Sequence, residues 1–233
     1  MDKGFLYRRL CAYIPCVLKS GEQTRISLSN KHQIASFQDV YLNTFYWEAL
    51  LALSFKPTII FDLGANFGLF SSLCNQVMQF KFENFAGQFF LVEANQRLIK
   101  YLHKNKFSLF SNDDVQLIYG LAGPNIDSSF KENSQNFLAS KISTDGVTVP
   151  FIDFNQYPTP SLLKIDIEGA ETLLFKNYFN WLSGAKAIII EFHLSDEERL
   201  PYEQMLLSCD FELLINRSEK SGFQNQLWVR KES

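Results

Sequence analysis

The chain has 233 residues, 46% of them hydrophobic and 20% charged, which is enough for one compact domain with a buried core. Its formal net charge of −3 and the lack of a basic stripe argue against a nucleic-acid partner. No apolar run approaches the roughly 20 residues that a membrane span needs, so we expect no membrane partner. The 4 cysteines lack zinc-ligand spacing and are typical of free thiols in a reducing cytoplasm, where we expect the protein to work.

The beginning of the chain predicts a helical extension, or cap, over residues 1–56, followed by the main domain over residues 57–233. Residues 38–54 have apolar side chains at helical spacing. Lys56-Pro57 is expected to end this helix, because the residue before a proline avoids helical backbone angles. The aromatic side chains of residues 37–47 either pack this helix onto the core or line an acceptor cleft.

From Thr58 onward, strand and helix patterns alternate along the chain. The expected strands lie at 58–62, 88–93, 115–121, 161–166, 186–193, 211–216 and 225–230. The first expected helix follows the first strand and runs to about residue 80. The other expected helices lie at 96–107, 169–181 and 196–208. Residues 123–159 break this rhythm and predict loops with short β-like pieces. The alternation predicts an α/β fold with a doubly wound, mostly parallel sheet and a C-terminal antiparallel hairpin at its edge.

The first buried strand runs into a glycine-containing turn, Asp62-Leu63-Gly64-Ala65-Asn66-Phe67-Gly68. Glycines let the backbone approach a ligand closely, so we interpret this turn as a cofactor loop; the alternative is a plain tight turn. A dinucleotide site has the spacing GxGxxG, whereas this loop has GxxxG and begins with an acid that repels a pyrophosphate. Glu93 ends the next strand, where a carboxylate accepts hydrogen bonds from ribose hydroxyls. The two features together predict S-adenosyl-L-methionine as the cofactor. Asp62 is placed to hold its ammonium group or a bridging water.

Charged side chains also follow two later strands of the predicted sheet. Asp166 and Glu168 lie two residues apart at the end of one strand, and Glu191 and His193 lie two residues apart at the end of the next. The carboxyl ends of parallel strands meet at one edge, so we expect these four side chains to form an active site beside the cofactor loop. Glu171 either belongs to this cluster or complements the dipole of the following helix as a first-turn acid.

These motifs resemble the FkbM-type family of S-adenosylmethionine-dependent methyltransferases. The resemblance runs from about Phe37 to the C-terminus, and its most specific parts are KIDIEGAE at 164–171 and IIIEFH at 188–193. It implies a class I (Rossmann-like) methyltransferase domain over 57–233 that O-methylates a hydroxyl of a sugar or secondary metabolite. The chain departs from the family pattern at Ala94-Asn95, where Pro-Asn or Pro-Ser is common. The expected cofactor contacts are Asp62, Gly64, Ala65, Asn66, Gly68, Glu93, Ala94 and Asp166.

The expected partner is a small-molecule hydroxyl acceptor, whose proton must leave as the methyl group arrives. We predict His193 as the general base, with Asp166 or Glu191 orienting it or substituting for it, and metal-free catalysis. The alternative is that Asp166, Glu168 and Glu191 bind Mg²⁺, which acidifies the hydroxyl. Two other functions compete with methyl transfer: a non-catalytic protein that binds the cofactor, and an NAD-dependent oxidoreductase, which lacks its GxGxxG motif here.

Overall fold

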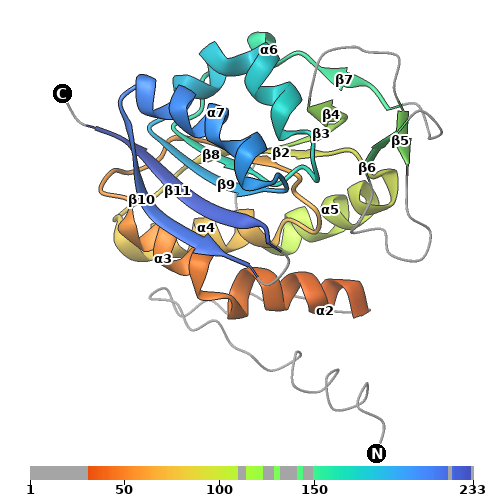
Figure 1. The fold of residues 1–233 in the computed structure, drawn as a ribbon. Coiled ribbons are helices and arrows are strands. Elements are labelled where there is room, and N and C mark those ends of the chain that lie inside the picture. Colours follow the sequence, from red (N-terminus) through yellow and green to blue (C-terminus); the bar gives the residue numbers. More distant parts are fainter. Residues whose placement is uncertain are drawn as a thin grey trace, which may run out of the picture.

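The computed structural model describes residues 31–109, 114–122, 129–131, 141–143, 149–219 and 222–231. In this part of the chain, seven strands form a sheet in the order β10-β11-β9-β8-β1-β2-β3 (Figure 1). The parallel strands are β1 (Ile59–Leu63), β2 (Gln88–Glu93), β3 (Val115–Tyr119), β8 (Leu162–Ile165) and β9 (Ala187–Phe192). β11 (Gln224–Arg230) is antiparallel to β9 and to the edge strand β10 (Phe211–Ser218). The predicted doubly wound sheet with its C-terminal edge hairpin is confirmed.

Helices cover both faces of the sheet (Figure 1). α4 (Leu69–Lys81) and α5 (Gln96–Leu109) pack on one face, and α6 (Glu171–Ser183) and α7 (Asp196–Ser208) on the other. β1 is apolar toward both layers: Ile60 packs with the α4 side, whereas Phe61 packs with the α6 side and stacks on Phe90 at 4.4 Å between ring centroids. Burial on both faces explains why the central strands appear in the sequence as continuous apolar runs.

The N-terminal segment differs from the single helix predicted over residues 38–54. It forms α2 (Lys31–Phe37), a π-helical turn η1 (Gln38–Leu42) and α3 (Thr44–Ala52). Asn43 has an extended backbone, and its side chain accepts a hydrogen bond from the Phe45 amide, so it begins a new helix. α3 ends well before Pro57. At the C-terminal end of α3, the Lys81 ammonium donates hydrogen bonds to the carbonyls of Leu51 and Leu53.

This segment packs against α4 and belongs to the same hydrophobic cluster. The Tyr41 hydroxyl donates to Ser72 Oγ at 3.0 Å, and the Phe45, Ala49 and Leu50 side chains are fully buried. Core packing therefore accounts for most of the aromatic residues at 37–47, although Tyr46 also lines a pocket. The first 30 residues of the predicted extension lie outside the described residues.

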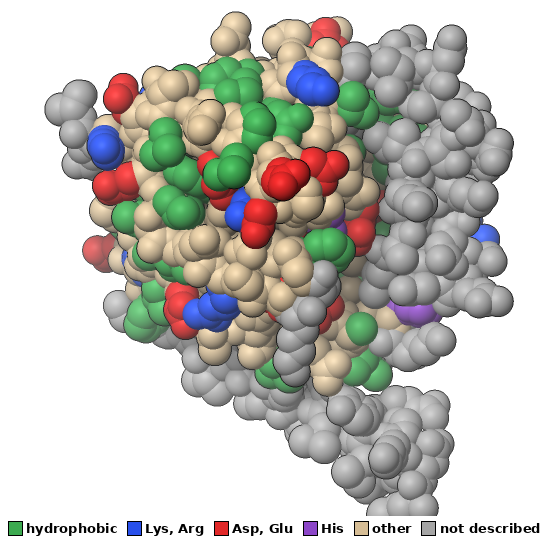
Figure 2. Space-filling view, in the orientation of Figure 1, with side chains coloured by type: hydrophobic (Ala, Val, Ile, Leu, Met, Phe, Trp, Pro, Cys, Tyr) green, Lys and Arg blue, Asp and Glu red, His purple; other side chains and the backbone are tan. Residues whose placement is uncertain are grey.

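The region predicted as irregular, residues 123–159, contains only short elements where it is described. β7 (Phe151–Ile152) pairs in parallel with β4 (Leu121–Ala122), which lies just before this region. β5 (Ser129–Lys131) pairs antiparallel with β6 (Lys141–Ser143), and η3 (Phe154–Gln156) precedes β8. No helix among the described residues is long and apolar enough to cross a membrane. On the face seen in Figure 2, the described Lys and Arg side chains are scattered among Asp and Glu and form no continuous basic patch.

Candidate active site

A pocket of about 300 Å³ opens at the carboxyl ends of the central strands, within the size range of small-molecule sites. The strand order reverses at β1, because the chain continues to β2 on one side and returns through β8 on the other. Such a reversal leaves a crevice between the loops that follow the strands. The pocket is lined by the loop after β1, the ends of β8 and β9, the β10–β11 turn, and the segment from α2 to α3.

The predicted cofactor loop forms one wall of this pocket through Gly64, Ala65 and Asn66. The Gly64 and Ala65 amides both donate to the Val92 carbonyl of β2, at 3.0 and 2.9 Å. Gly64 has a φ of +74°, and a Cβ atom there would lie 1.7 Å from the Asp166 carbonyl oxygen. The loop therefore needs glycine at this position because the end of β8 passes directly against its backbone.

Asp62 is fully buried and does not line the pocket. Its carboxylate accepts a hydrogen bond from Ser71 Oγ at 2.6 Å and forms an ion pair with Lys164 Nζ at 3.2 Å. The Lys164 ammonium also lies 3.3 Å from Asp166 Oδ2 and donates to the Gly64 carbonyl at 2.8 Å. Burial lowers the pKa of Lys164, but the charges of Asp62 and Asp166 outweigh it and raise the pKa overall. Lys164 thus joins the cofactor loop to the end of β8.

Glu93 holds the cofactor loop from the neighbouring strand. Its two carboxylate oxygens accept hydrogen bonds from the backbone amides of Asn66, at 2.8 Å, and Asn95, at 2.7 Å. Burial raises the pKa of Glu93 to about 7, although these two backbone hydrogen bonds act in the opposite direction. Glu93, Ala94 and Gly68 are not among the residues that line the pocket.

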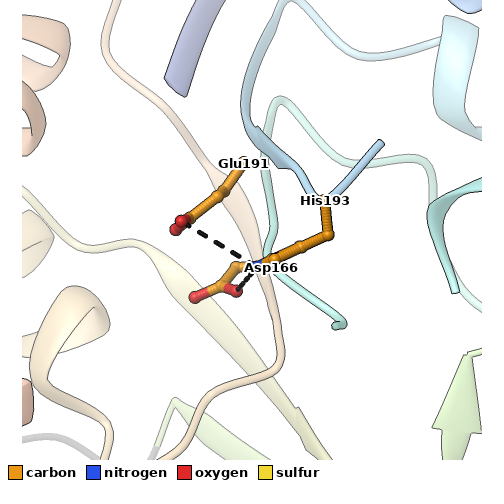
Figure 3. A group of neighbouring side chains, drawn as sticks. All are labelled: Asp166, Glu191 and His193. Atoms are coloured by element: carbon orange, nitrogen blue, oxygen red, sulfur yellow. Dashed lines mark ion pairs between the residues drawn. The ribbon is translucent and has the colours of Figure 1, made fainter. Parts of the chain in front are cut away.

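The four predicted catalytic residues meet where β8 and β9 end, beside the cofactor loop, and all four line the pocket. Asp166, Glu191 and His193 point toward one another (Figure 3), and one ligand atom from each lies within 4.8 Å of the others. His193 Nε2 is 3.8 Å from Asp166 Oδ1, 3.8 Å from Glu168 Oε2 and 3.9 Å from Glu191 Oε1. The predicted convergence is thus present in the structure. Carboxylate and imidazole groups at this spacing are also suited to a divalent cation.

Burial and mutual repulsion alter the ionisation of this cluster. Burial, followed by the negative charge of Asp166, raises the pKa of Glu191 to about 8. Burial likewise raises the pKa of Glu168, which has a left-handed backbone with a φ of +52°. Backbone strain at a residue other than glycine is concentrated at functional sites. Burial lowers the pKa of His193, but the hydrogen bond to Glu171 and the surrounding negative charges outweigh it and raise the pKa to about 9.

Glu171, rather than Asp166 or Glu191, is the hydrogen-bond partner of His193. Its Oε1 atom lies 2.9 Å from His193 Nδ1, and its side chain is fully buried at the start of α6. The His193 ring also packs edge-on against Phe223 from the β10–β11 turn, with 4.6 Å between ring centroids. The acidic KIDIEGAE motif singled out Glu171 as a candidate, but nothing in the sequence pointed to Phe223.

The outer wall of the pocket is polar and comes from elements without a sequence motif. Glu219 accepts hydrogen bonds from the side-chain amides of Asn43, at 3.3 Å, and Asn225, at 3.0 Å. Asp39 faces the same pocket, and burial followed by the charges of Asp166 and Glu219 raises its pKa. The carboxylates that line the pocket therefore outnumber its cations among the described residues.

The pocket residues fit a ligand that donates hydrogen bonds, as the ammonium and hydroxyl groups of S-adenosylmethionine do. The side-chain oxygens of Asn66 and Asn225 are buried and have no hydrogen-bond partner in the described part of the chain. A buried acceptor without a partner costs free energy unless a ligand or water satisfies it. Both residues line the pocket, one on the cofactor loop and one beside the acidic cluster.

No family model matches the chain. The hexuronic acid methyltransferase AglP of Haloferax volcanii is 23% identical over 218 residues, which cover 86% of this chain and 87% of that protein. Methyltransferase FkbM from Methylobacillus flagellatus KT has a TM-score of 0.54 at 16% identity, covering 87% of this chain and 56% of that one. Ribosomal protein L11 methylase from Lactobacillus delbrueckii subsp. bulgaricus has a TM-score of 0.51 at 14% identity, covering 93% and 88%. These solved structures confirm the class I methyltransferase fold, and the match to AglP over most of both chains supports a methyltransferase function.

Proposed function

We propose that this chain is an S-adenosylmethionine-dependent O-methyltransferase of the FkbM type that methylates a hydroxyl group of a sugar. The observation that carries the proposal is a single pocket lined by two different sets of groups. One set is Gly64, Ala65 and Asn66 of the cofactor loop, and the other is the cluster of His193 with Asp166, Glu168 and Glu191. A cofactor loop and groups able to accept a proton therefore face the same space at the carboxyl edge of the sheet.

Backbone and side-chain groups of the loop would hold the cofactor. Gly64, Ala65 and Asn66 line the pocket. Glu93 fixes the loop, and its carboxylate, which can accept more hydrogen bonds than the two from the backbone amides, would also accept from the ribose hydroxyls. Asp62 acts through Lys164 in this proposal, because its carboxylate is already paired inside the core. When bound, the cofactor supplies an electrophilic methyl group on a positively charged sulfur.

His193 is the proposed general base for the acceptor hydroxyl. With Nδ1 bonded to Glu171, the other ring nitrogen, Nε2, faces the pocket and the acidic cluster. The hydroxyl proton moves to Nε2, and the surrounding carboxylates stabilise the imidazolium that forms. A metal at Asp166 is disfavoured because the Lys164 ammonium is already 3.3 Å from one oxygen of that carboxylate.

A sugar hydroxyl is the acceptor group that best fits the outer wall. Sugars present many hydroxyls and an apolar ring face, which match the amides and carboxylates around Glu219 and the ring of Phe223. AglP, by its name, acts on a hexuronic acid. In this chain, Asp39, Glu219 and the acidic cluster would repel a carboxylate in the pocket, so we propose a hydroxyl rather than a carboxylate as the methylated group.

The proposal is tested with S-adenosylmethionine carrying a labelled methyl group and a panel of neutral sugars, hexuronic acids and polyhydroxylated secondary metabolites. We expect label on a sugar oxygen, located by mass spectrometry and NMR, and the same product in the presence of EDTA. Loss of product in EDTA and its recovery with Mg²⁺ would contradict the metal-free mechanism. Binding of S-adenosylhomocysteine without transfer to any acceptor would favour a non-catalytic protein, and thermal stabilisation by NADH instead would favour an oxidoreductase.

Glu93→Gln is expected to weaken binding of S-adenosylhomocysteine by about 10-fold or more, since a hydrogen bond to a charged group contributes about 1.5–3 kcal/mol. The pKa of Glu93 is raised to about 7, and the ionised carboxylate is the stronger acceptor. Affinity of the wild-type protein should therefore rise as the pH increases through about 7, and the variant should lose this dependence. Calorimetric titration from about one pH unit below this pKa to about one and a half above it measures both effects. The exposed Glu212→Gln on β10 is the control, and equal behaviour of the two variants would refute the assignment.

A further inference from the structure

Glu171 is an unusual acid for the first turn of a helix. First-turn acids complement the helix dipole from the surface, as Asp196, Glu197 and Glu198 do in α7, where all three are exposed. Glu171 has 0% exposure, and its Oε2 atom has no hydrogen-bond partner in the described ranges. Burial of a carboxylate is costly unless a specific partner compensates for it. The dipole of α6 alone therefore does not explain the position of this side chain.

The compensating partner of Glu171 is the imidazole of His193. Oε1 lies 2.9 Å from Nδ1, and the same oxygen accepts a hydrogen bond from the Gly169 amide at 3.2 Å. The other ring nitrogen, Nε2, lies 3.8–3.9 Å from three carboxylates, which is beyond hydrogen-bonding distance. The His193 side chain is only 8% exposed. Glu171 holds one edge of its ring, and Nε2 on the other edge faces the pocket.

We propose that Glu171 is the positioning residue of the active site: it holds a proton on His193 Nδ1 and thereby leaves Nε2 as the acceptor of the substrate proton. This inference rests on the proposed methyl transfer for its chemical consequence, but not for the state of the ring. A carboxylate at Nδ1 fixes both the tautomer and the orientation of an imidazole. Glu171 does not contact the pocket; it acts through His193.

The state of the ring is measured first on the wild-type protein, by NMR of ¹⁵N-labelled histidine at a pH above the His193 pKa of about 9. We expect the neutral His193 ring to carry its proton on Nδ1, and a proton on Nε2 would overturn the proposal. Assignment uses His193→Gln, since the chain has 3 histidines. This measurement needs neither a substrate nor a stable Glu171 variant, so it stays informative if methyl transfer is not found.

Glu171→Gln tests the functional consequence. The variant keeps the shape of the side chain and removes the charge, so the pKa of His193 should fall by about 1 unit or more. The carboxylates that face His193 from other elements remain in the variant: Asp166 at the end of β8, Glu168 after it, and Glu191 on β9. Lys164, which pairs with Asp166, also remains. The rate of methyl transfer on the alkaline plateau should fall by roughly 10²-fold, because the ring can then present a protonated Nε2 to the pocket.

The matched control is Glu197→Gln, which removes a first-turn acid from α7. A dipole role for Glu171 would lower the stability of both variants alike and leave the midpoint of the His193 titration unchanged, and that result would overturn the proposal. If the titration midpoint and tautomer change as expected while the wild-type protein methylates nothing, the pairing stands and the proposed function fails.

Discussion

Replacement of His193 by Gln is expected to lower the rate of methyl transfer to a sugar hydroxyl by about 10²–10⁴-fold, the contribution of a general base. Glutamine is the informative replacement because its amide can donate to Glu171, which is otherwise left as a buried carboxylate without a partner. Affinity for S-adenosylhomocysteine should be retained, since the hydrogen bonds that hold the cofactor loop come from Val92, Glu93 and Lys164 rather than from His193. The rates come from product formation under saturating cofactor.

The His193→Gln variant also identifies the group that causes the pH dependence of the reaction. A base must be unprotonated to accept a proton, and the pKa of His193 is raised to about 9 in the protein without ligands. The value of kcat/KM in the wild-type protein should therefore rise with pH and reach a plateau only above about pH 9. Glu191 ionises in the same range, with a pKa of about 8, so the assignment depends on whether this limb disappears in the His193 variant.

His103→Gln provides the control for the general effect of losing a histidine. His103 is exposed on α5, and its replacement should leave both the rate and the pH profile unchanged. A His193 variant with near wild-type turnover on the true acceptor would show that another group of the cluster, such as Glu168, accepts the proton. A loss of cofactor affinity equal to the loss in rate would instead indicate a role in binding.

The fold could be predicted because its local signals agree with its tertiary structure. The runs 59–61 in β1 and 187–190 in β9 are apolar throughout, and both strands are buried between two helical layers. The charged residues that end such strands had to meet at one edge, and Asp166, Glu191 and His193 do so. The apolar runs and the charged residues that end them were thus sufficient to predict the sheet, its edge hairpin and the acidic cluster of the candidate site.

The remaining features depend on contacts that no local pattern encodes. The predicted helix over 38–54 is broken because Asn43 caps a new helix, and α3 ends early because Lys81, from α4, binds its last carbonyls. The pairing of Glu171 with His193 requires the start of α6 to lie over the end of β9, which is a property of the packing. Phe223 reaches the pocket only because the register of β10 and β11 sets the position of their turn.

Gly64→Ala should be the most destabilising single methyl addition in the described part of the active site. A residue with a side chain at a φ of +74° costs about 1–2 kcal/mol relative to glycine. The added Cβ would in addition lie 1.7 Å from the Asp166 carbonyl oxygen and 2.9 Å from its carbon, so the loop and the end of β8 must separate. Forced overpacking typically costs about a further 1–3 kcal/mol, and we expect a total loss of about 2–5 kcal/mol in the free energy of unfolding.

The clash should add to the cost of the backbone angle, and a second glycine separates the two contributions. Gly222 has a φ of +89°, and a Cβ atom added there would meet nothing within 4 Å, so Gly222→Ala carries only the backbone cost. Urea unfolding of both variants should therefore show a clearly larger loss for Gly64→Ala, and equal losses would contradict the packing argument.

The Gly64 loop is also tied to Val92 and Lys164, so any movement that relieves the clash displaces the pocket wall. Gly64→Ala protein that remains folded should accordingly bind S-adenosylhomocysteine more weakly, whereas Gly222→Ala should retain its affinity. Calorimetric titration of the two folded variants measures this difference. Unchanged affinity in Gly64→Ala would mean that the loop absorbs the added methyl group without moving the residues that line the pocket.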